Sequence, residues 1–210
     1  ENLNFSMTAP GFNAVFGPSG VGKTSFARLL AKQEPDRDPG IITRNICSIL
    51  YSYNLERLPG WSSTGTHLER ICPKGKEALK NQLIEIFRLQ PVLESRFSQL
   101  SMGQQNRMNL IRYLLQDFDL LIMDESLANV DEKLRETIIL SVKDLFPHKM
   151  FLYISHNLME VARFCRDILV LGEASSKKKN RMVRGRDYKN GYSLDKGELD
   201  RAMLEIMNAF

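Results

Sequence analysis

The spacing of hydrophobic residues changes repeatedly along this chain and predicts strands that alternate with helices. Continuous apolar runs at residues 120–123 and 150–154 are typical of strands buried on both faces. Apolar residues three and four positions apart predict amphipathic helices between the strands. The predicted strands are residues 3–7, 13–16, 46–51, 120–123, 150–154 and 168–171, and the predicted helices are residues 24–32, 76–89, 102–115, 132–145 and 195–206.

Several local signals refine these elements. Ser101 and Gln104 form a capping-box pattern at the start of one helix, and Asp131 is placed to cap the next. Residues 34–66 and 174–192 are predicted to be irregular, because turn-forming or polar residues interrupt them. Strands that alternate with helices predict an α/β fold, with a mostly parallel sheet flanked by helices. In the helix after residue 24, we expect the inward side to carry Phe26, Leu29 and Leu30.

Length and composition fit a single globular domain with a small inserted lobe. The chain has 210 residues, of which 43% are hydrophobic and 26% are charged, and this is enough to bury a core without disulfides. No apolar run reaches the roughly 18 residues needed to cross a bilayer, and residues 1–5 lack the features of a secretory signal. The cysteines Cys47, Cys72 and Cys165 are scattered, so we interpret them as reduced thiols of a cytoplasmic protein.

One basic segment stands out from the modest net charge of +4. We interpret this segment as a solvated loop rather than a lipid or nucleic-acid surface, because no nucleic-acid recognition motif accompanies it. The residues of the basic segment are Lys177, Lys178, Lys179, Arg181, Arg184 and Arg186.

The strongest chemical signal follows the predicted strand at residues 13–16. Glycines there let the backbone fold so tightly that several N–H groups converge on phosphate oxygens, and the next helix points its positive end at the anion. In such a P-loop, Lys23 reaches the β- and γ-phosphates and the Thr24 hydroxyl ligates Mg²⁺. The predicted nucleotide-binding residues are Gly17, Pro18, Ser19, Gly20, Val21, Gly22, Lys23, Thr24 and Ser25.

Two carboxylates follow the apolar run at residues 120–123. With a P-loop upstream, we expect Asp124 to hold Mg²⁺ through its water shell and Glu125 to polarise an attacking water as general base. Without the P-loop, two solvated acids at a strand end would explain them equally well. His156 follows the strand at residues 150–154, where we expect it to contact the γ-phosphate. His67 and His148 are assigned to loops.

A second anion site is predicted at residues 100–105. Ser101 and Gly103 coincide there with a helix N-terminus, which favours negative charge. One nucleotide cannot easily use two such sites in the same chain. We therefore expect a second copy of the chain to supply this site across an interface.

Taken together, these motifs resemble the nucleotide-binding subunit of an ATP-binding-cassette (ABC) transporter, over nearly the whole chain. The likeness is greatest to importer subunits of the nitrate, sulfonate and taurine type. It implies a P-loop NTPase with a RecA-like core at about residues 1–59 and 116–210 and an inserted helical subdomain at about residues 60–115. The matching motifs are the Walker A segment at 17–24, the signature at 100–104, Walker B at 120–125, a D-loop-like segment at 127–131 and the switch histidine His156.

The resemblance also implies cofactors, partners and roles. ATP and Mg²⁺ would be the cofactors, with Lys23, Glu125 and His156 catalytic. The partners would be a second nucleotide-binding subunit in a homodimer, a transmembrane permease subunit and a solute-binding protein, with no nucleic acid. The chain would lie peripherally on the cytoplasmic face of the membrane. The residues expected to act across the dimer are Ser101, Gly103, Gln104 and Asp131.

The sequence departs from this family pattern in four places. Met102 replaces the first glycine of the signature, and Ser126 replaces a proline after the Walker B glutamate. The expected Q-loop glutamine is absent; alignment places Tyr53 there, and a one-residue shift places Asn54. The chain also begins beyond the aromatic residue that stacks on adenine in the family, so adenine specificity follows from the resemblance alone.

We therefore expect an ATP-hydrolysing subunit that powers a membrane transporter, in the direction of import. The degenerate Q-loop and signature leave open a nucleotide-binding partner subunit with weak or no turnover. An ABC-type ATPase of DNA repair or chromosome structure is disfavoured, because no heptad run separates Lys23 from Ser101.

Overall fold

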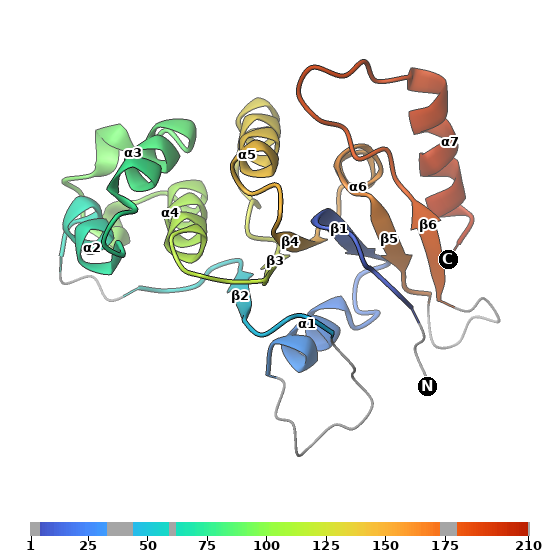
Figure 1. Ribbon diagram of the computed structural model, residues 1–210, viewed down its shortest axis with the longest axis horizontal. Helices are drawn as coiled ribbons and strands as arrows, with labels where there is room; N and C mark the ends of the chain where they lie inside the picture. Colours follow the sequence, from blue (N-terminus) through green and yellow to red (C-terminus); the bar gives the residue numbers. More distant parts are fainter. Residues whose placement is uncertain (1–4, 33–43, 59–61, 173–179, 210) are drawn as a thin grey trace.

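A computed structural model describes residues 5–32, 44–58, 62–172 and 180–209. Its centre is a sheet with the strand order β2-β3-β4-β1-β5-β6, flanked by helices (Figure 1). Neighbouring strands run parallel, except for the antiparallel pair of β5 and β6. The predicted α/β class with a mostly parallel sheet is confirmed. The strands are β1 (Gly11–Phe16), β2 (Ile49–Tyr53), β3 (Leu120–Asp124), β4 (Met150–Ile154), β5 (Asp167–Val170) and β6 (Arg181–Arg184).

The strand register brings the carboxyl ends of four strands to one edge of the sheet. Asp124 at the end of β3 lies opposite Tyr53 of β2 and opposite Ile154 of β4. Val15 of β1 lies opposite the same Ile154. In parallel sheets, ligands bind in the crevice outside these carboxyl ends. The loops that follow these strands are far apart in the sequence, but they therefore start side by side at this edge.

The two faces of the sheet are covered by different helices. Leu121 and Met123 belong to the larger core, which also contains α4 (Met102–Leu114) and α5 (Glu132–Leu145). Leu120 and Ile122, which alternate with them along β3, belong to a smaller core with α1 (Lys23–Lys32). This alternation is the period of two that a strand imposes. Consequently, α1 and α4 lie on opposite faces of the sheet.

The predicted helix caps are present. Ser101 accepts a hydrogen bond from the Gln104 N–H, and the Gln104 side chain accepts one from the Ser101 N–H, which completes the capping box at α4. Asp131 caps α5 through the Leu134 N–H. Asp195 caps α7 (Lys196–Met207) in the same way. Each cap satisfies backbone donors that the helix itself leaves unpaired.

A group of helices lies at one side of the sheet, toward the left of Figure 1. It contains α2 (Thr64–Ile71), α3 (Glu77–Ile86), the 3₁₀ turns η1 (Gln90–Val92) and η2 (Phe97–Gln99), and α4. The sequence analysis missed α2, because Gly65 interrupts the pattern. Ser63 nevertheless caps α2 through the Thr66 N–H, and Leu68 is fully buried. His67 therefore lies on a helix and not in a loop, whereas His148 does lie in a turn.

Other boundaries differ from prediction. A strand was expected at residues 3–7, and this prediction is wrong for residues 5–7, which pair with no other strand. Residues 3 and 4 lie outside the described part. β2 begins at Ile49 instead of residue 46. Leu29 is 46% exposed, while Ala27 takes the inward place on α1. The helix predicted to reach residue 89 ends at Ile86.

Two further elements, besides α2, were not predicted from the sequence. α6 (Leu158–Phe164) is only seven residues long, too short for its apolar spacing to stand out. β6 lies within the segment predicted as a loop and has only one buried residue, Val183. It exists because β5 offers it an antiparallel partner, which is a tertiary effect.

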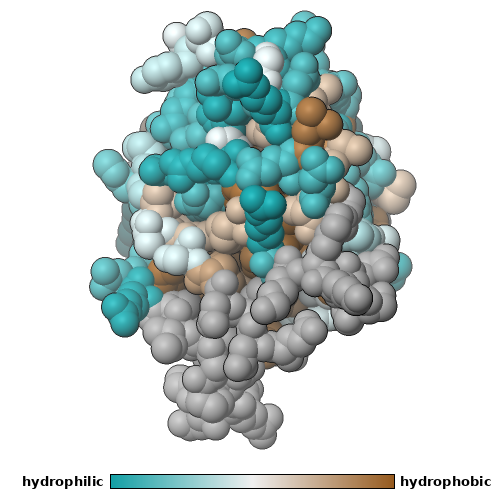
Figure 2. Space-filling model, turned by 90° about the vertical axis from the view of Figure 1, so that its right-hand side faces the viewer, coloured by the Kyte–Doolittle hydropathy of each residue, from teal (hydrophilic) through white to brown (hydrophobic). Residues whose placement is uncertain are grey.

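The basic segment is likewise only partly a loop. Arg181 and Arg184 lie on β6, and Arg184 pairs with Asp167 of β5 at 2.6 Å. Arg186 forms an ion pair with Glu198 of α7. Residues 177–179 lie outside the described part. The face that carries α7 is mostly hydrophilic (Figure 2).

Two further expectations concern cysteines and membranes. Cys47, Cys72 and Cys165 are free thiols, as expected. Within the described ranges, every helix is too short or too polar to cross a bilayer.

Candidate phosphate-binding site

The loop between β1 and α1 has the backbone conformation that the P-loop pattern requires. Gly20 and Gly22 adopt φ angles of 80° and 104°, a region that other residues rarely occupy. At Gly17, an added Cβ would lie 2.5 Å from the Leu171 carbonyl oxygen, so a side chain is excluded there. The loop leads directly into the N-terminus of α1, whose backbone N–H groups and dipole favour an anion.

Lys23 is folded back onto this loop. Its Nζ donates to the carbonyl oxygens of Gly17 and Pro18, both at 2.8 Å, and the residue is only 6% exposed. Burial lowers the pKa of Lys23, while the nearby carboxylates of Glu125 and Asp124 act in the opposite direction. The ammonium group is thus held between the P-loop and the two acids. Thr24 and Ser25 are exposed at the start of α1.

Asp124 is buried at the end of β3, and two hydrogen bonds hold its place. Its carbonyl oxygen accepts a hydrogen bond from the Asn54 N–H at 3.0 Å. Its carboxylate Oδ2 accepts one from the Tyr51 hydroxyl at 2.9 Å. Burial and the hydrogen bond to Asp124 raise the pKa of Tyr51 to about 12. The sequence analysis missed Tyr51, because aromatic residues on a half-buried strand are usually there for packing.

Glu125 adopts a left-handed backbone conformation, with φ of 53°. This conformation is uncommon outside glycine and often marks functional sites. The Glu125 N–H donates to the Ile154 carbonyl oxygen at 3.0 Å, so the turn is attached to β4. Its carboxylate Oε1 lies 2.5 Å from His156 Nε2, and both side chains are partly exposed. The predicted base and the predicted switch histidine are therefore neighbours.

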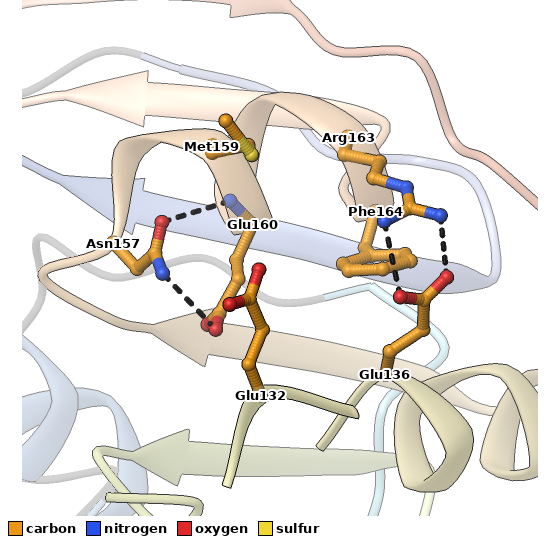
Figure 3. A pocket seen from close by; sticks show the side chains of 7 residues that line it. All are labelled: Glu132, Glu136, Asn157, Met159, Glu160, Arg163 and Phe164. Atoms are coloured by element: carbon orange, nitrogen blue, oxygen red, sulfur yellow. Dashed lines mark hydrogen bonds and ion pairs between the residues drawn. The ribbon is translucent and has the colours of Figure 1, made fainter. Parts of the chain in front are cut away.

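A buried carboxylate supports the backbone around His156. Glu160 accepts hydrogen bonds from the Tyr153 hydroxyl at 3.0 Å and the Ser155 hydroxyl at 3.3 Å, and it pairs with Arg135 of α5 at 2.7 Å. Asn157 caps α6 through the Glu160 N–H (Figure 3). Asn157 and Glu160 line a small pocket together with Arg163 and Glu136, which pair with each other (Figure 3). Because these groups are mostly satisfied by one another, we interpret the pocket as structural.

The signature segment uses its side chains within its own chain. The Ser101 and Gln104 side chains cap α4, as described above. Gly103 is buried, and a Cβ there would lie 2.1 Å from the Asn129 carbonyl oxygen. Packing against the D-loop-like segment therefore requires glycine at position 103, independently of any contact with a second copy of the chain. Met102, by contrast, is 54% exposed.

The two Q-loop candidates have separate surroundings. Tyr53 is 41% exposed and its ring stacks on that of Tyr51, with centroids 5.5 Å apart. The Asn54 side chain accepts a hydrogen bond from Asn106 Nδ2 at 2.8 Å. Asn106 also donates to the Ala128 carbonyl oxygen at 2.8 Å, and so joins α4 to the segments after β2 and β3. Asn106 was not predicted as a site residue.

More side chains of α4 hold the segment after β2, and we call this group of contacts the polar seam. Asn109 donates to the Glu56 carbonyl oxygen at 2.8 Å. Arg112 and Tyr113 bind the Glu56 carboxylate at 3.1 Å and 2.9 Å. Similarly, the Ser126 hydroxyl donates to Ser52 and joins the segment after β3 to β2. Ser126, which stands where the family pattern has a proline, therefore makes a contact that proline could not make. The polar seam consists of Asn106, Asn109, Arg112 and Tyr113 with residues 54–56.

The donor groups fit a magnesium ion shared with phosphates. Mg²⁺ is commonly bound through one or two carboxylates together with phosphate oxygens and water. Asp124 and the Thr24 hydroxyl are such oxygen donors. Among the described residues no group of three or more His, Cys, Asp or Glu side chains could hold a metal by itself, so phosphate oxygens would have to complete the coordination.

Comparison with known proteins gives a family match for the sequence and a shared fold among solved structures. The sequence profile described as ABC transporter matches residues 1–128. The chain is 30% identical over 194 residues to the molybdenum import ATP-binding protein ModC of Saccharophagus degradans, covering 82% of this chain and 53% of that protein. It is 29% identical over 198 residues to the Fe(3+) ions import ATP-binding protein FbpC of Escherichia coli K12, covering 82% and 55%.

The chain thus spans about half the length of these curated relatives. Solved structures share the fold. A dimeric ATP-binding cassette in a post-hydrolysis state with ADP and Pi matches with a TM-score of 0.68 and 20% identity, covering 90% of this chain and 91% of that one. The archaeal ribosome recycling factor aABCE1 matches with a TM-score of 0.70 and 20% identity, covering 94% of this chain and 37% of that one.

Proposed function

This chain belongs to the ABC transporter family, and from this premise we propose that it binds ATP with Mg²⁺ and hydrolyses it to power import across a membrane. The observation that carries the proposal is the meeting of Lys23, Glu125 and His156 at one edge of the sheet. Phosphoryl transfer to water uses a cation for the phosphates, a group that orients the water and further contacts that stabilise charge on the γ-phosphate.

Each group has a proposed part in the reaction. The P-loop amides and Lys23 would bind the phosphates, and Thr24 and Asp124 would hold the metal. Mg²⁺, when bound, neutralises charge on the phosphate oxygens. Glu125 orients and polarises the attacking water, and His156 contacts the γ-phosphate from β4. The Glu125 and His156 side chains already touch, so they can act on the same water and phosphate.

We propose that the complete site needs two copies of the chain, arranged head to tail. The P-loop begins α1 on one face of the sheet, whereas Ser101 begins α4 on the other. A chain with this arrangement does not bring its own signature onto its own P-loop. Ser101, Gly103, Gln104 and Asp131 of one copy would therefore close on the nucleotide held by the other. The fold match to a dimeric ATP-binding cassette is consistent with this arrangement.

The remaining partners follow from the import relatives. We propose a transmembrane permease subunit that is contacted by the helical subdomain at about residues 60–115, with the RecA-like core at about residues 1–59 and 116–210. The chain would then lie peripherally on the cytoplasmic face of the membrane. A solute-binding protein would complete an importer of this kind.

The importer subtype stays a prediction. The sequence resemblance favours nitrate, sulfonate or taurine importers, but the relatives found by comparison are named for molybdenum, Fe(3+) and spermidine/putrescine import. The alternative of a partner subunit with little turnover has no specific support, since Glu125 and His156 are both in place.

The substitution Glu125→Gln tests this proposal, because it keeps the shape of the side chain and removes the base. We expect phosphate release from ATP to fall at least about 100-fold, while calorimetric titration with ATP shows unchanged binding. Glu205→Gln on the exposed surface of α7 is the matched control and should leave both measurements unchanged. Both variants should be assayed alone and with the permease subunit. Full turnover in Glu125→Gln would exclude the proposed base.

A further inference from the structure

We propose that Tyr51 is a positioning residue that holds the Asp124 carboxylate in place for Mg²⁺. This inference rests on the proposed nucleotide site and adds a residue outside its motifs. Tyr51 lies on β2, two residues before Tyr53, which is the register partner of Asp124. Side chains two residues apart on a strand share a face, so Tyr51 lies on the same side of the sheet as the Asp124 side chain.

The contact between these residues is direct and oriented. The Tyr51 hydroxyl lies 2.9 Å from Asp124 Oδ2, and it can only donate to a carboxylate. Stacking on the Tyr53 ring, with an interplanar angle of 24°, limits the movement of the phenol. The same acid is held through its backbone by the Asn54 N–H. Asp124 is therefore held at two points, its carboxylate Oδ2 and its backbone carbonyl oxygen, which leaves Oδ1 to face the metal or its water shell.

Neither of the residues first considered for this loop does the same. The Asn54 side chain is joined to Asn106, a contact that belongs to the polar seam. Tyr53 supplies its ring to the stack, with its side chain partly exposed to solvent. Of the three side chains at the end of β2, the structure thus assigns the contact with the metal-binding acid to Tyr51.

A hydrogen bond of this kind changes metal affinity without touching the metal. Partners that orient a ligating side chain typically contribute about 10- to 100-fold in metal affinity. The donor leaves the negative charge on Asp124 and removes rotational freedom that the ion would otherwise have to restrict. Loss of this hydrogen bond should therefore weaken ATP binding in the presence of Mg²⁺. It should leave ATP binding without Mg²⁺ unchanged, because the P-loop contacts to the phosphates stay intact.

The test compares ATP binding in EDTA with ATP binding in excess Mg²⁺, and we call the ratio of the two dissociation constants the magnesium gain. In Tyr51→Phe, which keeps the stacked ring, we expect the magnesium gain to fall about tenfold with binding in EDTA unchanged. Tyr113→Phe is the matched control, since its hydroxyl also donates to a carboxylate at 2.9 Å, that of Glu56. It should leave the magnesium gain unchanged.

A double-substitution cycle separates this inference from the function on which it rests. Asp124→Asn should remove most of the magnesium gain, and adding Tyr51→Phe to it should cause no further loss. If Asp124→Asn keeps the full gain, the proposed metal site fails. If Asp124→Asn behaves as expected but Tyr51→Phe alone keeps or increases the gain, only the role of Tyr51 is overturned. Thermal unfolding of each variant identifies loss of binding that comes from loss of folding.

Discussion

The phosphate site and the group of helices beside it are held in place by different means. In the phosphate site, backbone geometry positions the chemistry: β1, β3 and β4 end at one edge, and Lys23, Asp124 and His156 follow from them. The helices α2, α3 and α4 lie outside the sheet, and α4 is joined to the segment after β2 by side chains of the polar seam. The first arrangement depends on the whole sheet, and the second combines apolar packing of α4 in the larger core with the polar contacts of the seam.

This difference indicates which substitutions should remove a single chemical group and which should alter the placement of α4. A change in the phosphate site removes a chemical group and leaves the fold intact, because the parallel strands still define the edge. A change in the seam weakens the attachment of α4, and a change at the start of α4 alters the signature itself. Seam variants should therefore affect stability, and signature variants should affect turnover.

The largest effect is expected from Gly103→Ala. The new methyl group would lie 2.1 Å from the Asn129 carbonyl oxygen, so α4 or residues 127–131 must shift. A misplacement of about 1 Å at a catalytic interface can lower turnover about 100-fold, and we expect a loss of that order in phosphate release with ATP binding retained. Gly197→Ala on α7, which meets only the side chain of Asp195, should be near neutral. Wild-type turnover in Gly103→Ala would show that this contact does not position the signature.

A smaller effect is expected from Asn106→Ala in the polar seam. The substitution leaves the Ala128 carbonyl oxygen and the Asn54 side chain without their buried donor. Leaving such groups unpaired costs about 1–3 kcal/mol, which denaturant unfolding can measure. Asn190→Ala, which removes an exposed contact with Asp144, should change the free energy of unfolding by less than about 0.5 kcal/mol. Equal effects of the two variants would contradict the importance of the seam.

The smallest effect compares two serine caps that have the same geometry. Ser63 and Ser101 have nearly equal φ and ψ angles, and each accepts from the N–H three residues later. Alanine at either position should cost about 1 kcal/mol in the free energy of unfolding. Only Ser101→Ala should also lower phosphate release, because only this serine is proposed to meet a second nucleotide. An equal loss of turnover in Ser63→Ala would contradict the proposal that only Ser101 meets the nucleotide of a second copy.

The motifs of the candidate phosphate site were easier to recognise in the sequence than several of the elements around them. The P-loop and the acids after β3 are contiguous motifs whose spacing is set by local geometry, so they could be recognised without a fold. β6 and α2 were missed because their formation depends on a partner strand and on packing against α4. The Q-loop assignment to Tyr53 or Asn54 did not anticipate Tyr51, because a contact between residues 51 and 124 is set by strand register.

Local sequence patterns thus identified the family and the mostly parallel sheet, and they predicted the phosphate-binding residues. Only the tertiary structure decided that Tyr51 contacts Asp124, that Glu125 meets His156 and that Asn106 joins α4 to two loops. Only the tertiary structure also placed α1 and α4 on opposite faces of the sheet. The physical reason is that these contacts arise from strand order and register, which bring together residues that are distant in the sequence.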